Sequence, residues 1–202
     1  MEFCIKLLLV AFIIDGASRG FKLGNAMIIR DTLTANRTYY VRTDGSDSND
    51  GLSNTAGGAF LTIQHAVDVV CNTIDNMGYN VTIQVADGAY NAAVLLKPYV
   101  GSGTVTLQGN TTTPANVTIT LTSGHCISAQ YASQLWNIAG FKLSTSSGGG
   151  DCLQAISARI AFGNMEFGAC IGNHIYAAFN SYVEASANYK ISGGGTYHAN
   201  AG

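Results

Sequence analysis

The sequence has little charge and almost no proline. Only 11% of its 202 residues are charged, against roughly 25% in an ordinary soluble domain. The formal net charge is −2, so the chain lacks the basic surface that nucleic-acid binding requires. Glu, Lys, Arg, Leu and Gln are scarce, which disfavours an all-helical bundle.

The sequence is rich in glycine, threonine and asparagine. It holds 24 Gly but only 2 Pro, and its hydrophobic share of 47% excludes disorder by composition. This balance favours a β-rich protein of small side chains with many tight turns. The length suits one domain or a piece of a larger protein.

An apolar run covers residues 7–14, which is too short to span a bilayer. Three interpretations of residues 1–33 stay open: a secretory signal peptide, an incorrectly assigned start with translation beginning at Met27, and a genuine structural segment. The signal peptide of the first interpretation would fall within residues 1–26. Glu2 and the poor cleavage site at residues 15–19 fit a signal peptide badly. None of the three places a transmembrane helix in the mature protein.

Residues 62–74 carry the one convincing helix pattern. Their apolar residues recur at helical spacing and form a single stripe: Ile63, Ala66, Val67, Val70 and Ile74. Thr62 is a suitable N-cap. Before this helix we expect a strand over residues 38–43 and a turn-rich loop over residues 44–51.

After the helix the pattern changes to the period of two that is typical of strands. We expect strands over residues 81–85, 93–97, 105–109 and 117–122, with a turn over residues 86–90. The segment that begins at Val105 nearly repeats the segment that begins at Val81, 24 residues earlier.

The second half contains a weak internal repeat of 24 residues. Residues 140–143, 164–167 and 188–191 share the order small or Asn, apolar, charged, apolar. A second register follows His125, Asp151, His174 and Tyr197, with separations of 26, 23 and 23 residues. Such a period in a β-type sequence is typical of a β-solenoid, in which each coil buries its inward side chains against the next.

Two segments, residues 39–52 and 60–68, resemble the N-terminal cap of pectate-lyase-like right-handed parallel β-helix proteins. More narrowly, the chain resembles phage and prophage tail-fibre or tailspike proteins, over about residues 34–202. The resemblance implies an all-β fold, a right-handed single-stranded parallel β-helix with coils of about 22–26 residues and an N-terminal capping α-helix. The cap would cover residues 34–80 and the coils residues 81–202, with a C-terminal truncation.

The same resemblance implies a structural component of a tail fibre or tailspike that recognises a host surface polysaccharide. It implies a homotrimer in the full-length protein, contacts with other tail proteins and a virion or extracellular location after synthesis in the bacterial cytoplasm. Neither nucleic acid nor a membrane is an expected partner. The alternative is a polysaccharide lyase or glycoside hydrolase of the same superfamily, because a fold does not by itself decide function.

The loop over residues 44–51 offers Asp44, Asp47, Asn49 and Asp50 as oxygen ligands that would suit Ca²⁺. It lacks a downstream Glu at EF-hand spacing. We favour the simpler interpretation, in which these short side chains cap their own backbone in Asx-turns. The sequence therefore predicts no metal or cofactor here.

The residues His125, Asp151 and His174 would form a ladder if the second register is right. Adjacent members would lie about 5 Å apart, close enough for a proton relay or a metal site. The favoured alternative is a stack of polar corner residues. Cys126 and Cys152 follow in the same register, which allows either a disulfide or a pair of stacked thiols.

The five cysteines are odd in number and include no CxxC pair. We therefore expect buried, reduced residues rather than a disulfide scaffold. The cysteines are Cys4, Cys71, Cys126, Cys152 and Cys170.

Paired carboxylates for glycoside hydrolysis are not evident. The acids of the coil region do not share a coil position: Asp87, Asp151, Glu166 and Glu184. They also do not cluster around the few basic residues, Lys97, Lys142, Arg159 and Lys190. We predict no catalytic residue. Among the coil aromatics we expect Tyr182 and Tyr189 to be exposed and most others to lie in the core.

Overall fold

A computed structural model describes residues 22–23, 27–28, 30–146 and 148–202. The interpretations of the leader therefore concern a stretch that lies mostly outside the described residues, and so does Cys4. Two short strands, β1 (Lys22–Leu23) and β2 (Met27–Ile28), pair antiparallel. A second small pair, β3 (Asp31–Thr32) and β5 (Ile74–Asp75), is parallel.

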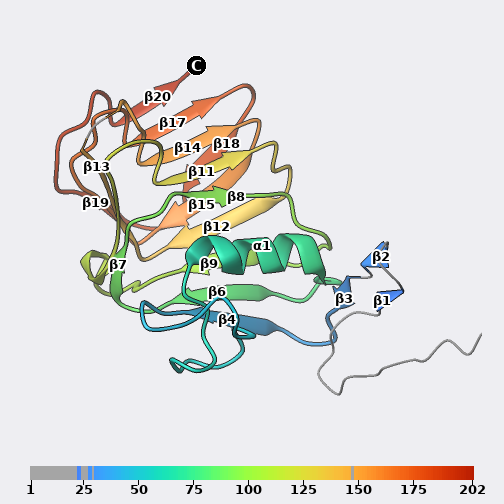
Figure 1. The fold of residues 1–202 in the computed structure, drawn as a ribbon. Helices are drawn as coiled ribbons and strands as arrows, with labels where there is room; N and C mark the ends of the chain where they lie inside the picture. Colours follow the sequence, from blue (N-terminus) through green and yellow to red (C-terminus); the bar gives the residue numbers. More distant parts are fainter. Residues whose placement is uncertain (1–21, 24–26, 29, 147) are drawn as a thin grey trace, which may run out of the picture.

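Three parallel sheets make up the body of the molecule (Figure 1). Sheet I has six strands: β4 (Arg37–Val41), β6 (Val81–Val85), β9 (Val105–Gln108), β12 (Leu135–Ala139), β15 (Arg159–Gly163) and β18 (Tyr182–Ala185). Sheet II has five: β7 (Gly88–Tyr90), β10 (Val117–Leu121), β13 (Lys142–Thr145), β16 (Met165–Phe167) and β19 (Tyr189–Ile191). Sheet III has five: β8 (Val94–Leu96), β11 (Ile127–Gln130), β14 (Leu153–Ile156), β17 (Ile175–Ala178) and β20 (Ala199–Ala201).

The chain visits the three sheets in the same order throughout. Strands β6, β7 and β8 belong to sheets I, II and III, and the next strands repeat that order up to β18, β19 and β20. We call three consecutive strands of this kind a circuit. Every pairing within the three sheets is parallel. The expected all-β class, with parallel sheets and one α-helix among the described residues, is confirmed.

The 24-residue register is also confirmed. Val81 pairs with Val105, and Lys142 pairs with Glu166, which in turn pairs with Lys190. The first position of the repeat is a corner in the left-handed region, with φ +80° at Gly140 and +49° at Asn164. Glycine and asparagine accept this conformation at least cost, which explains why the repeat starts with them.

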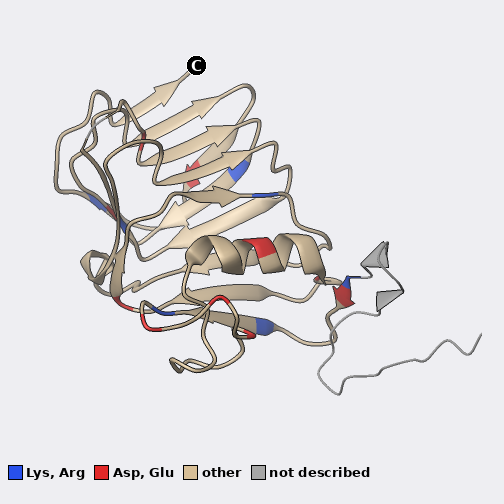
Figure 2. Ribbon diagram, viewed as in Figure 1, with Lys and Arg blue, Asp and Glu red and all other residues tan. Residues whose placement is uncertain are grey.

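The core is one hydrophobic cluster with members from all three sheets. In β6 the side chains of Val81, Ile83 and Val85 are buried and alternate with half-buried ones. The alternation is the period of two that the sequence shows, with apolar side chains on one face and polar side chains on the other. Figure 2 shows that most of the stacked strands carry no charged residue.

Helix α1 (Ile63–Thr73) packs against β4, β6 and β8 with its apolar stripe buried. Thr62 is its N-cap and accepts a hydrogen bond from the backbone N–H of His65 at 3.2 Å. The predicted helix is one residue too long, because Ile74 has extended backbone and begins β5. No described helix has the length and apolarity to cross a membrane.

One predicted turn is partly a strand. Residues 88–90 of the expected turn over residues 86–90 form β7, the first strand of sheet II. A three-residue strand that starts with glycine carries a turn signal in its sequence, and only pairing with β10 makes it a strand. The proposed division between a cap over residues 34–80 and coils from residue 81 stays a prediction; β4 pairs with β6 across it.

Candidate functional sites

The loop over residues 44–51 uses its polar side chains to hold the start of α1. One carboxylate oxygen of Asp47 accepts hydrogen bonds from the backbone N–H groups of Leu61 and Thr62, both at 2.9 Å. Its other oxygen accepts from the Thr62 hydroxyl at 2.8 Å. These bonds satisfy backbone donors just before the helix, as a capping carboxylate does.

The remaining candidate calcium ligands also have partners within the loop. The carboxylate of Asp44 binds the Arg42 guanidinium, and Asp50 accepts from the backbone N–H of Leu52 at 3.0 Å. The Asn49 amide donates to the carbonyl oxygens of Ala56 and Ala59. This arrangement matches the Asx-turn interpretation. Nowhere in the described residues do three His, Cys, Asp or Glu gather in a group that could hold a metal ion.

The ladder predicted from His125 is only partly assembled. The Nδ1 atom of His125 accepts from the backbone N–H of Asp151 at 3.0 Å and lies 3.2 Å from the Asp151 carboxylate. The next member is Asn173, whose backbone and side-chain N–H groups each donate to Asp151 at 2.8 Å.

His174 was predicted to be the third member of this ladder, and that prediction is wrong by one residue. Leu153 pairs with Ile175, a separation of 22 residues, so the position below Asp151 is 173. Because neighbouring residues of a strand face opposite sides, a shift of one residue turns the His174 side chain to the other face.

His174 is 2% exposed and belongs to a second cluster instead. Its Nε2–H donates to the carbonyl oxygen of Gly168 at 2.9 Å, and its Nδ1 lies 3.4 Å from Nδ1 of His198. The Nε2 of His198 accepts from the Tyr189 hydroxyl at 3.0 Å. Burial and the neighbouring His174 lower the pKa of His198, so the neutral ring is favoured and the chain of hydrogen bonds is complete without charge.

The two cysteines that precede strands β11 and β14, Cys126 and Cys152, are buried free thiols and form no disulfide. Cys126 donates to the carbonyl oxygen of Ser144 at 3.2 Å. Cys71 and Cys170 are likewise buried and free. The expectation of buried, reduced cysteines is confirmed for these four, and their carbonyl contacts suit neutral thiols without catalytic character.

Glu166 on β16 is the most strongly perturbed carboxyl of the described residues. It lies 2.9 Å from the Lys142 ammonium and 3.5 Å from that of Lys190, and it accepts from the Ser192 hydroxyl at 2.6 Å. The Ser192 hydrogen bond and the Lys142 charge lower its pKa to about 2. A carboxyl that stays ionised cannot act as a general acid at neutral pH, so its role is to join three neighbouring strands.

The basic residues thus have single acidic or aromatic partners rather than acidic clusters. Lys97 binds Asp68 at 2.7 Å, and the guanidinium of Arg159 lies 5.5 Å from the centre of the Tyr182 ring. The Tyr182 hydroxyl in turn binds the Glu184 carboxylate. No pair of acids flanks an open site in these contacts.

A polar hollow of about 330 Å³ lies where strands β6 and β9 of sheet I end. We call it the Asp87 hollow. Its lining residues are Asn54, Gln84, Val85, Ala86, Asp87, Gly109, Asn110 and Thr111. The Asp87 carboxylate accepts from the side-chain amides of Asn110 at 3.0 Å and Asn116 at 2.9 Å, which fix its orientation. Sequence analysis missed this site because its residues belong to separate turns that only the sheet register brings together.

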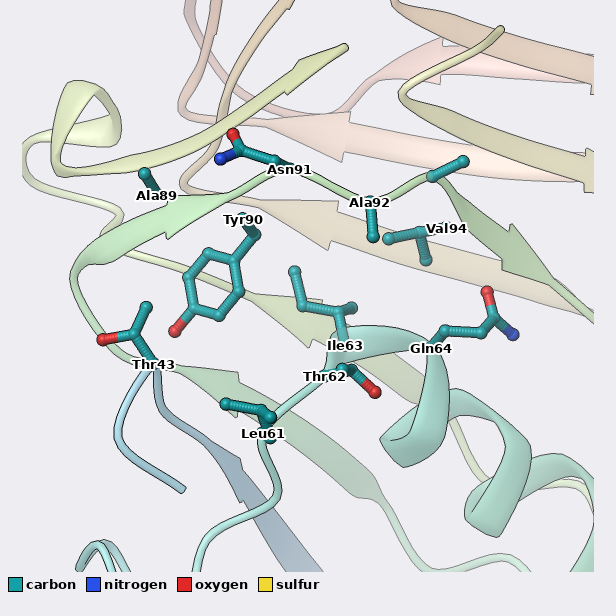
Figure 3. A pocket seen from close by; sticks show the side chains of 11 residues that line it. Thr43, Leu61, Thr62, Ile63, Gln64, Ala89, Tyr90, Asn91, Ala92 and Val94 are labelled. Carbon is teal, nitrogen blue, oxygen red and sulfur yellow. The ribbon is translucent and has the colours of Figure 1, made fainter. Parts of the chain in front are cut away.

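A second pocket, of about 190 Å³, lies between the start of α1 and the segment that joins β7 to β8 (Figure 3). Leu61, Ile63 and Val94 contribute to its largely apolar lining. The Tyr90 hydroxyl donates to the Ala86 carbonyl at 3.0 Å, and burial raises its pKa to about 12. The pocket therefore offers no ionisable group for chemistry at neutral pH.

The aromatic residues divide nearly as predicted. Trp136, Phe141 and Phe167 are fully buried, whereas Tyr182 and Tyr189 are exposed by 44% and 40%. Phe179 is the exception to the expected core, because it is 70% exposed in a turn with positive φ. Comparison with known proteins identifies no relative: no family model, curated protein or solved structure matches the chain.

Proposed function

We propose that the chain is a right-handed parallel β-helix segment of a phage or prophage tail fibre or tailspike, of the pectate-lyase-like kind, and that it recognises a surface polysaccharide of the host. The observation that carries the proposal is the stack of three parallel sheets, visited in one order with a 24-residue register. A rigid stack of this kind suits a fibre component, because each added circuit lengthens it without a new core.

The polysaccharide part of the proposal is supported by the Asp87 hollow. Its carboxylate and amides can accept from and donate to sugar hydroxyls, and it is open at the surface beside sheet I. In the family that the chain resembles, the full-length protein would be a homotrimer in contact with other tail proteins, in the virion or outside the cell.

Mass spectrometry of purified virus particles tests the structural part. Particles are induced from the organism that encodes the chain and separated on a density gradient. We expect its peptides to co-sediment with major tail proteins. Peptides found only in the soluble fraction, in a culture that does release particles, would contradict the virion proposal.

A depolymerisation assay decides between binding and catalysis. The protein is incubated with purified bacterial surface polysaccharides, and new reducing ends and unsaturated products are measured. We expect none, because no described carboxylates form a pair suited to the reaction. Turnover that disappears on substitution of one acid, such as Asp87 or Glu184, would instead establish the lyase or hydrolase alternative.

A further inference from the structure

Sheet I presents an uncharged hydrogen-bonding face next to the Asp87 hollow. The face consists of Thr82, Gln84, Thr106, Gln108 and Asn137, which we call the amide–hydroxyl patch. All five are half-buried and alternate with buried core residues along β6, β9 and β12. Thr82 pairs with Thr106, which pairs with Asn137, so similar polar groups repeat from strand to strand.

The amides of the patch hold one another in place. The side chain of Gln108 donates to the Gln84 side-chain oxygen at 2.9 Å. The Gln84 amide donates to the backbone carbonyl oxygens of Gln108 and Gly109 at 3.2 and 3.3 Å. Gln84 also lines the hollow, so the patch and the hollow form one continuous polar surface.

The charges around this surface are unsuited to an anionic ligand. The only ionisable residue in the lining of the hollow is Asp87, an acid. Arg42 reaches the lining residue Asn54 at 3.3 Å, but its guanidinium also binds both oxygens of Asp44. Recognition of carboxylate or phosphate in proteins relies on arginine or lysine with free donors, and the surface offers none among the residues that line it.

We infer that the glycan which binds this surface is a neutral polysaccharide and not a uronic-acid or sialic-acid polymer. This inference rests on the proposed function and names its ligand class. A neutral sugar hydroxyl both donates and accepts, which matches side-chain amides and threonine hydroxyls. The Asp87 carboxylate accepts from hydroxyl groups in a charge-assisted bond but repels another carboxylate.

Binding to a printed array of purified neutral and acidic bacterial polysaccharides tests the inference. We expect the wild-type protein to bind neutral members at least about tenfold more tightly than acidic ones. Raising the NaCl concentration changes this affinity by less than about twofold, because no ion pair forms with the ligand.

Three variants assign the binding to the surface. Gln84→Ala and Asp87→Ala are each expected to weaken binding by about tenfold or more, a factor in the range of lost polar contacts. Thr120→Ala, at an exposed position of β10 in sheet II, is the matched control and keeps wild-type affinity. Circular dichroism melting curves establish that each variant is folded, and a surface double variant, Thr82→Ala with Thr106→Ala, replaces any that is not.

The outcomes separate the two proposals. Preference for acidic polysaccharides, or neutral binding that is unaffected by the Gln84 and Asp87 substitutions, would overturn the inference and leave polysaccharide recognition standing. Failure of the folded protein to bind any member of the array would count against polysaccharide recognition itself.

Discussion

The two ends of the sheet stack have the same strand geometry but very different surroundings. At one end α1 packs against β4, β6 and β8, and Val81 and Val94 are at most 1% exposed. At the other end lie β18, β19 and β20, where Ile191 is 47% exposed although its partner Phe167 is fully buried. The comparison teaches that the sequence pattern places a side chain on the core face, and the neighbouring circuit decides whether that position is buried.

The largest effect is expected from truncation within the middle circuits. Phe167→Ala should lower the free energy of unfolding by about 3–5 kcal/mol, because it leaves a cavity beside Phe162 and His174. Ile191→Ala, in the same column at the open end, should cost about 1 kcal/mol or less. Urea titration of both variants measures the difference, and equal losses would contradict the comparison.

At the covered end, the attachment of α1 depends on Asp47. Asp47→Ala should lower the free energy of unfolding by about 1–2 kcal/mol, because three donors at the start of the helix lose their acceptor. Asp44→Ala is the control: it removes an exposed ion pair with Arg42 and should have the smaller effect. A larger loss for the control would show that the loop matters for another reason.

The Lys142–Glu166–Lys190 column connects the middle circuits with the open end. Its pKa of about 2 lies below the ordinary 4.5, so Glu166 stabilises the fold above pH 4.5, and this contribution is lost as the pH falls toward 2. After allowance for solvent screening, we expect a loss on the order of 1 kcal/mol. Urea midpoints across this range should fall less steeply for Glu166→Gln, and parallel curves would contradict the assignment.

The smallest effect concerns His198 at the open end. Its pKa is lowered by burial and by His174, so the unfolded chain takes up the proton first. Stability from the neutral ring is therefore present above pH 6.5 and decreases as the pH falls below it. The change in urea midpoint from pH 7.5 to 5.5 should shrink in His198→Phe. An unchanged slope would show that this histidine does not contribute to the acid sensitivity of the open end.

The candidate sites were harder to derive from sequence than the strands. The pairing of His125 with Asp151 followed from spacing, but the separation that follows Asp151 is 22 residues and not 23, which moved His174 into a different cluster. Loop lengths between strands vary freely at the surface, so a weak repeat fixes a register only where strands are in contact. The Asp87 hollow had no sequence signal, since Asn54, Asp87 and Asn110 come from three separate turns.

The sequence by itself determined the β-rich class, the single helix with its Thr62 cap, and the 24-residue register of residues 142, 166 and 190. Those features depend on local periodicity and on the backbone preferences of glycine and asparagine, which act over a few residues. Only the tertiary structure decided that residues 88–90 form a strand, which face His174 occupies and which polar groups meet at the hollow. Parallel strands pair across long connections, so these contacts arise from packing between circuits and leave no local trace in the chain.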